Sequence, residues 1–256
     1  MVATYIQQSI EQLKTNIFMH VRHRTLIQYT GSPLLDENQL FYLLLPFLNG
    51  EKWDEQIQES AITVGIVHAS LSEHDKISET NATSKEQQLT VLSGDYYSGR
   101  YYEILAHSGN ITLIRQLSEG IVTRCEHQIK LYESTQYTIN EWYQITSGIQ
   151  TELIKRFYQV YQFEQYSSFM HTALLLLQLR KELRNHQNDN PSSLFLKMKE
   201  SVSGQGNSIV SIIQSEIDSL NNLLNEYLQS SSYLKDDLKL YIKQQVAFND
   251  KLTRER

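Results

Sequence analysis

The chain has 256 residues, enough to bury one large hydrophobic core, and its net charge of −6 excludes a general nucleic-acid binder because it offers no basic field to displace counterions. Its single cysteine, Cys125, excludes an internal disulfide and suits a reducing compartment, so we expect a cytoplasmic protein. The long apolar runs, 40–45 and 173–177, are far shorter than the roughly 20 residues of a transmembrane segment, which leaves only peripheral contact with a membrane surface.

Apolar residues recur at intervals of three and four along most of the chain, and no stretch alternates with the period of a strand. Three prolines and ten glycines are few, which favours long helices. The sequence therefore predicts an all-α protein of about nine or ten helices. In chain order the expected helices are 2–28, 40–45, 52–73, 84–108, 110–134, 138–162, 166–185, 194–203, 208–229 and 233–250.

Several helix starts carry capping signals. Ser84 and Thr138 are each followed three residues later by Gln87 or Glu141, the pattern of a capping box, and Asn110 directly precedes an apolar run. Pro46 should end the short helix expected at 40–45, which Asp36 caps.

No repeat or linker divides the chain, so we expect a single all-helical domain, 1–256. Polar stretches near 74–83, 185–193 and 203–208 are expected to be mobile loops. The helix at 208–229 carries a heptad seam, which is typical either of an ordinary bundle core or of a surface that packs on a partner helix. The seam consists of Val210, Ile213, Ile217, Leu220, Leu224 and Tyr227.

The helix expected at 84–108 is unusual because it contains two interior glycines, Gly94 and Gly99, each of which costs about 1 kcal/mol relative to alanine. Gly94 lies four residues before Ser98, so the two share a face on which another backbone can approach closely. Tyr97 and Tyr101 share a second face, which Leu105 continues. The helix also carries a cluster of aromatic side chains, Tyr96, Tyr97, Tyr101 and Tyr102.

This run, which begins at Gly94-Asp95-Tyr96-Tyr97 and continues through Tyr102, resembles the Gly-Asp-Tyr helix of trans-prenyl diphosphate synthases. The doubled tyrosines make it more similar to the small subunits of two-component heptaprenyl diphosphate synthases. Recognisable motif is confined to residues 60–110. The resemblance implies the isoprenoid-synthase fold and gives as candidates for a substrate channel or a subunit interface Gly94, Asp95, Tyr96, Tyr97, Ser98, Gly99, Tyr101 and Tyr102.

Two of these assignments have alternatives. The tyrosines are either core and interface residues or walls that limit a growing isoprenoid chain. Asp95 either pairs locally, with Arg100 or with a neighbouring helix, or binds a charged ligand.

Enzymes of this family hold magnesium on two aspartate-rich helical motifs, whose hard carboxylate oxygens bridge the metal to a diphosphate. By its order before the Gly-Asp-Tyr helix, the first motif should occupy five positions, which here are His74, Asp75, Lys76, Ile77 and Ser78. Only Asp75 is a carboxylate; with His74 and Ser78 it makes a poor magnesium cage, and Lys76 adds repulsion. The basic pair that normally follows this motif is also missing. We therefore expect no metal site in this chain.

The second aspartate-rich motif is also absent. Asp236 and Asp237 are adjacent, but Leu240 stands where a third carboxylate belongs and no aromatic-Gln pair precedes them. Two solvated aspartates near a helix start are the simpler interpretation.

The resemblance thus implies a non-catalytic accessory subunit that binds no cofactor itself. The catalytic subunit, component 2, would supply both aspartate-rich motifs and Mg²⁺, and isoprenoid diphosphate would be met only through the complex. This chain would support its partner and product length, and a heptaprenyl product would serve menaquinone side chains. A free-standing helical adaptor that makes no product is the alternative, and a terpene-synthase-like enzyme with atypical metal ligands is a third.

Overall fold

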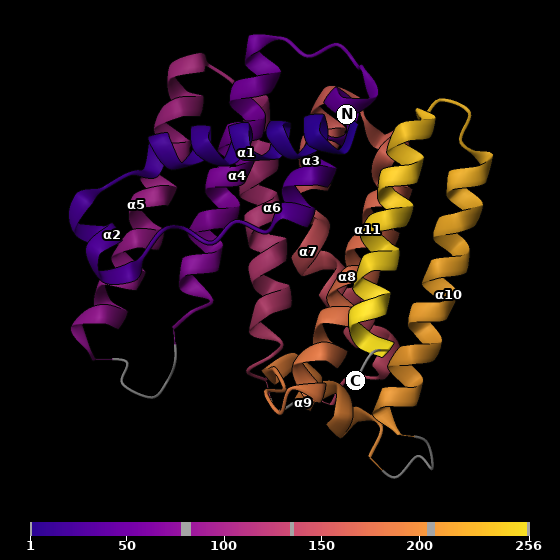
Figure 1. Ribbon diagram of the computed structural model, residues 1–256. Coiled ribbons are helices and arrows are strands. Elements are labelled where there is room, and N and C mark those ends of the chain that lie inside the picture. The colour runs from indigo at the N-terminus through magenta and orange to yellow at the C-terminus, as the bar shows by residue number, and fades with distance from the viewer. Residues whose placement is uncertain (1, 78–82, 134–135, 204–207, 255–256) are drawn as a thin grey trace. The chain divides into compact units, whose positions relative to one another are not determined.

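The computed structural model describes residues 2–77, 83–133, 136–203 and 208–254, and all regular structure in these ranges is helical, which confirms the all-α prediction (Figure 1). In chain order the helices are α1 (Val2–Val21), α2 (Arg24–Thr30), α3 (Glu37–Asn49), α4 (Glu55–His74), α5 (Lys85–Ser108), α6 (Ile111–Ile129), α7 (Ile139–Tyr161), a 3₁₀ turn η1 (Glu164–Tyr166), α8 (Ser167–Gln187), α9 (Ser193–Ser201), α10 (Ile209–Ser230) and α11 (Asp236–Arg254). None of the described helices is both long and apolar enough to span a bilayer.

The helices group into two compact units. The first consists of Met1–Glu119 with Leu153–Phe163, and the second of Gly120–Glu152 with Glu164–Arg256, so two of the three boundaries fall inside α6 and α7 and the third between α7 and η1. The expectation of one domain over 1–256 stays a prediction.

In the first unit, α1 buries the apolar face expected from its sequence, including Ile10 and Ile17, against α3 and α4. The predicted helix 2–28 is wrong in one respect, because the chain leaves the helix at residues 22–23 and α2 begins anew. His23 is the cause: its Nδ1 accepts the backbone N–H of Leu26 at 3.4 Å, which caps α2 and lets Leu26 enter the core.

The helix expected at 40–45 is α3 in the structure, and it is longer than predicted. Asp36 caps it as expected, accepting the Asn38 N–H at 2.8 Å, but α3 runs through Pro46 and ends only before Gly50, whose φ of 93° is left-handed. A proline inside a helix leaves the carbonyl four residues earlier without its usual donor. Here that carbonyl belongs to Tyr42 and receives the hydroxyl of Tyr158, which makes the interior proline tolerable.

The capping signals are confirmed. Ser84 Oγ accepts the Gln87 N–H at 3.2 Å and Asn110 Oδ1 accepts the Leu113 N–H at 3.1 Å. Thr138 and Glu141 form both halves of a capping box: the Glu141 carboxylate accepts the Thr138 N–H at 2.7 Å, and the Thr138 hydroxyl accepts the Glu141 N–H at 3.3 Å.

Several other boundaries also differ from the sequence prediction. α6 ends at Ile129 instead of residue 134, because the chain tightens there into turns whose N–H groups bond carbonyls three residues back. α8 continues past 185 to Gln187, and Asp189, with a φ of 56°, ends that run. α11 begins at Asp236 instead of residue 233.

In the second unit, α8 packs against α10 and α11 and buries its leucine run, 174–177. The seam of α10 faces this core, with Ile213, Ile217 and Leu224 buried. Leu228, not the predicted Tyr227, is the buried residue at its end. The seam therefore serves the bundle core of this chain, the first of the two interpretations.

Candidate functional site

The site expected from the sequence lies where α4 and α5 pack against each other in the first unit. Small residues make the close approach possible. The hydroxyl of Ser70 on α4 donates to the Gly94 carbonyl at 2.8 Å and lies 2.8 Å from the hydroxyl of Ser98. Gly94 and Ser98 thus share a contact face, as predicted.

A steric constraint explains why position 94 is a glycine. A Cβ atom built at this position would lie 2.4 Å from Nε2 of His74, the last residue of α4. The imidazole therefore occupies the space that any larger residue would need. Gly94 and His74 together fix the distance between the two helices at this level.

Asp95 pairs with the neighbouring helix and not with Arg100. Its Oδ1 lies 3.6 Å from Nε2 of His74, an ion pair when the imidazole is protonated, with side chains 65% and 37% exposed. Arg100 instead contacts the carboxylate of Glu103 and donates from Nε to the carbonyl of His20 at 3.0 Å.

The five positions of the expected first metal motif do not lie on one helix face. α4 ends at His74, Asp75 is its exposed C-cap, and Lys76 and Ile77 follow in a turn; Ser78 lies outside the described residues. In the described part of the chain no group of three His, Cys, Asp or Glu side chains is placed to hold a metal ion.

A second carboxylate, which the sequence analysis missed, stands one position before the motif. Glu73 is 1% exposed, and its Oε1 lies 2.6 Å from Nζ of Lys76. Its Oε2 is buried and has no hydrogen-bond partner among the described residues. The spacing of three between Glu73 and Lys76 could have signalled this pair, which is directed into the protein and not toward a diphosphate.

The tyrosines of α5 occupy different environments. Tyr97 is completely buried, whereas Tyr102 is 57% exposed. Tyr96 stands edge-on to the His23 ring with centroids 5.5 Å apart, and Tyr101 is half-buried, which raises its pKa. The four rings therefore do not form one continuous wall.

Tyr97 lies in an environment that disfavours its ionised form. Burial, followed by the negative charge of Glu73, raises its pKa to about 12, and its hydroxyl has no hydrogen-bond partner in the described residues. The Ser93 hydroxyl acts in the opposite direction on this pKa, but it lies outside hydrogen-bonding geometry to Tyr97 and instead pairs with Thr30 Oγ1 at 3.3 Å.

The aspartates of the expected second motif stand at the start of α11. The side chain of Asp236 is 99% exposed and lies 3.5 Å from Nζ of Lys239, while Asp237 Oδ1 accepts the Leu238 N–H at 2.7 Å. Neither aspartate is joined by a third carboxylate in the described residues. Both aspartates therefore lie at a helix start, where a negative charge is favourable, in agreement with the simpler interpretation.

The fold is that of trans-prenyl diphosphate synthases. The chain aligns with a decaprenyl diphosphate synthase from Rhodobacter capsulatus at a TM-score of 0.69 and 12% identity, covering 99% of both chains. A polyprenyl synthase from Caulobacter crescentus CB15, solved with calcium and isoprenyl diphosphate, gives a TM-score of 0.70 at 11% identity, covering 100% of this chain and 97% of that one. A geranylgeranyl pyrophosphate synthase from Corynebacterium glutamicum gives 0.70 at 13%, covering 99% and 98%. Identities this low establish the fold alone.

The sequence itself identifies the family. The chain is 28% identical over 145 residues to heptaprenyl diphosphate synthase component 1 of Geobacillus stearothermophilus, a match that spans 57% of this chain and 66% of the relative's length. The family model described as heptaprenyl diphosphate synthase subunit 1 matches residues 23–229, which is most of the chain. The chain therefore belongs to the family of heptaprenyl diphosphate synthase subunit 1.

Proposed function

We propose that this protein is the non-catalytic accessory subunit of a two-component heptaprenyl diphosphate synthase and works in the cytoplasm with a catalytic subunit. One observation carries the proposal. Where the first aspartate-rich motif would bind magnesium, Asp75 at a helix end is the one carboxylate among the five positions, while the nearby Glu73 is buried and paired with Lys76. Magnesium bound to diphosphate needs several oxygen ligands at one place, so Mg²⁺ and the diphosphates that react with its help belong on the partner.

The outer face of α5 is the surface that we propose for the partner. Leu92 and Tyr102 are 52% and 57% exposed, and a Cβ at Gly99 between them would meet no atom within 4 Å. Gly65 and Gly94, by contrast, each make room for a side chain of the neighbouring helix. An interior helix glycine that nothing in the first unit requires is accounted for if a second protein approaches there.

This chain would contribute to catalysis by shaping the groove that holds the growing product. A heptaprenyl chain is long and apolar, and each added isoprene unit needs more groove shielded from water. A second subunit lengthens or closes such a groove without taking part in the chemistry. The product would then be a heptaprenyl diphosphate destined for menaquinone side chains.

An activity assay with separated subunits tests this division of labour. This chain alone, the catalytic subunit alone, and an equimolar mixture are each given an allylic diphosphate, isopentenyl diphosphate and Mg²⁺, and the products are sized by mass spectrometry. We expect no condensation by this chain alone, and full-length product only from the mixture. Turnover by this chain alone contradicts the proposal, as does a mixture whose rate and product length equal those of the catalytic subunit.

The proposed interface has its own test. Gly99→Leu and Tyr102→Ala should each weaken association with the catalytic subunit at least about tenfold, because central interface residues typically contribute 1–2 kcal/mol or more. Met19→Ala is the matched control, since Met19 is 70% exposed but lies on α1. Equal affinities for all three variants, measured by titration calorimetry, would place the interface elsewhere.

A further inference from the structure

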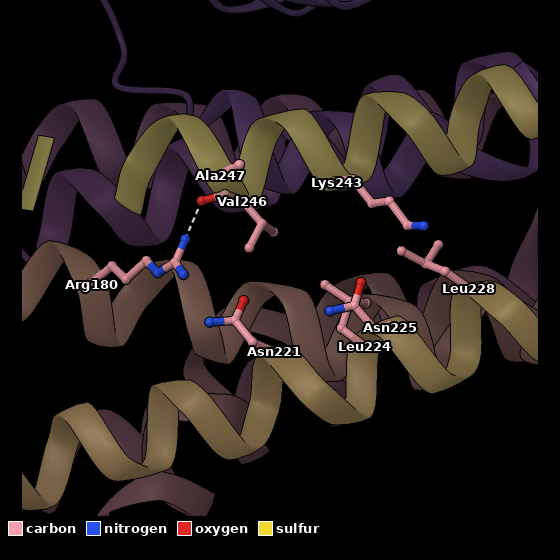
Figure 2. A pocket seen from close by; sticks show the side chains of 8 residues that line it. All are labelled: Arg180, Asn221, Leu224, Asn225, Leu228, Lys243, Val246 and Ala247. Atoms are coloured by element: carbon pink, nitrogen blue, oxygen red, sulfur yellow. Dashed lines mark hydrogen bonds between the residues drawn. The ribbon is translucent and has the colours of Figure 1, made fainter. Parts of the chain in front are cut away.

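The second unit contains a polar pocket that the proposed function does not use. It lies between α8, α10 and α11 and has a volume of about 280 Å³ (Figure 2). Four polar side chains line it: Arg180 from α8, Asn221 and Asn225 from α10, and Lys243 from α11. Three helices therefore bring two cations and two amides to one place.

Arg180 supplies a fixed positive charge. Its side chain is almost completely buried, with the residue 2% exposed, and Nη1 donates to the main-chain carbonyl of Val246 on α11 (Figure 2). This bond holds the guanidinium across the gap between α8 and α11. A buried guanidinium stays charged at every physiological pH and is an effective anchor for oxyanions.

The other polar groups have no partners that would compete for them. Asn221 and Asn225 stand one turn apart on α10, and neither amide makes a hydrogen bond to another described residue. The ammonium group of Lys243 likewise makes no ion pair within the described part of the chain. Each amide carries two N–H donors and the ammonium three, so the pocket offers more donors than the protein uses.

The remaining residues of the lining favour ionic contacts with these charges. Leu224, Leu228 and Val246 form apolar walls, and none of the lining residues is acidic. The two charged residues of the lining, Arg180 and Lys243, are therefore both cations, in a chain whose net charge is −6. Apolar walls lower the local dielectric, which makes an ionic contact stronger than at an open surface.

We propose that this pocket binds a small phosphate-type oxyanion, with Arg180 and Lys243 meeting its charge and the amides of Asn221 and Asn225 donating to its oxygens. Two cationic side chains in one lining match a multiply charged anion better than a single carboxylate. The volume is below the range of about 300–1,000 Å³ for drug-sized ligands, so a phosphate or diphosphate group fits and a nucleotide does not. Such an anion could be free pyrophosphate or the head group of an isoprenyl diphosphate.

Titration calorimetry on the isolated full-length chain, in buffer containing EDTA, tests the pocket. Inorganic pyrophosphate should bind saturably. Lys243→Gln and Asn225→Asp should each weaken the affinity about tenfold or more, because one loses a charged donor and the other adds a repelling charge. Both residues are exposed enough to be replaced without unfolding the chain.

Two matched controls separate the pocket from the general surface charge. Lys239→Gln removes a lysine from the same helix, and Asn222→Asp adds a carboxylate to the same turn of α10, yet neither residue lines the pocket. Both should bind pyrophosphate within about twofold of the parent chain. Absence of saturable binding by the parent chain, or equal weakening by the controls, would overturn the proposal.

A second titration identifies the source of the anion. Geranyl diphosphate that binds more tightly than pyrophosphate assigns the pocket to a prenyl head group, and equal or weaker binding assigns it to the free anion. This inference goes beyond the proposed function and is independent of it. The titrations need no catalytic partner, so a failure here leaves the mixed-subunit assay unaffected.

Discussion

The hydroxyl of Tyr158 on α7 donates its hydrogen to the main-chain carbonyl of Tyr42 on α3, and both residues are completely buried. Tyr42 lies four residues before Pro46, which has no N–H to offer this carbonyl. A side chain more than a hundred residues away thus supplies the donor that the proline removes. The pair explains how α3 stays helical through a proline in the core of the first unit.

Tyr158→Phe should destabilise the protein by about 1–3 kcal/mol, because it takes the hydroxyl away from a buried carbonyl. The loss should shrink in a Pro46→Ala background, where the new N–H of residue 46 can reach the Tyr42 carbonyl within the helix. Urea unfolding of the two single variants and the double variant measures this coupling.

Tyr102→Phe is the control for this comparison of single and double variants. The ring of Tyr102 is exposed, so removing its hydroxyl should change the stability of the protein by less than about 0.5 kcal/mol. A coupling of zero between positions 158 and 46 would mean that the hydroxyl does not compensate for the proline.

The helical plan follows from local patterns, and so the sequence predicts most of it. Ser84, Asn110 and Thr138 start helices for reasons contained within three residues, and the structure confirms them. The α1–α2 break and the passage through Pro46 were missed because their causes are a side-chain cap and a tertiary hydrogen bond. Neither leaves a trace in the hydrophobic periodicity.

The candidate site was also predicted only in part, because local spacing reveals a helix face but not what packs against it. Spacing along α5 correctly placed Gly94 and Ser98 on one face. It could not reveal that the residue beside Gly94 is His74, or that Glu73 is buried, because both depend on how α4 docks. The roles proposed for the tyrosines in a substrate channel or an interface stay predictions.

Tyr97→Phe should leave the protein as stable as the parent at pH 8, or up to about 1–2 kcal/mol more stable, because it deletes a buried hydroxyl that has no partner among the described residues. This outcome is the opposite of that for Tyr158→Phe, although both remove one hydroxyl from a buried tyrosine. The comparison separates hydrogen bonding from burial, and urea unfolding measures both variants.

The same variant should change the response to alkali. Tyr97 keeps its proton up to a pKa of about 12 in the folded state, against 10.0 for an ordinary tyrosine, so unfolding releases a proton between these values. Its contribution to stability is therefore complete below pH 10 and is lost as the pH rises toward 12. The stability of Tyr97→Phe relative to the parent chain should increase from pH 8 to pH 11. A difference that stays constant with pH would show that Tyr97 titrates normally.

Lys76→Met should destabilise the first unit by about 2–3 kcal/mol, because it leaves the Glu73 carboxylate, 1% exposed, without its cation. The loss should be below the roughly 3–5 kcal/mol of a fully buried pair, since the lysine side chain is 28% exposed and water reaches it. Adding Glu73→Gln should recover most of the loss, which chemical denaturation can measure. Lys239→Met, which breaks an exposed pair with Asp236, should change little. A comparable loss in this control would argue against burial as the cause.

Gly99→Ala should stabilise the isolated chain by about 0.5–1 kcal/mol, because alanine restricts the unfolded backbone and its Cβ meets no atom within 4 Å. Gly94→Ala brings the same gain in helix propensity but places its Cβ 2.4 Å from His74 Nε2, so the imidazole must leave Asp95 or the helices must separate. We therefore expect no net stabilisation for Gly94→Ala. Urea unfolding of the two variants gives the difference directly, and equal gains would show that His74 moves aside freely. If Gly99→Ala is more stable alone yet binds the catalytic subunit less well, this glycine is present for the partner, since the fold of the first unit would be better without it.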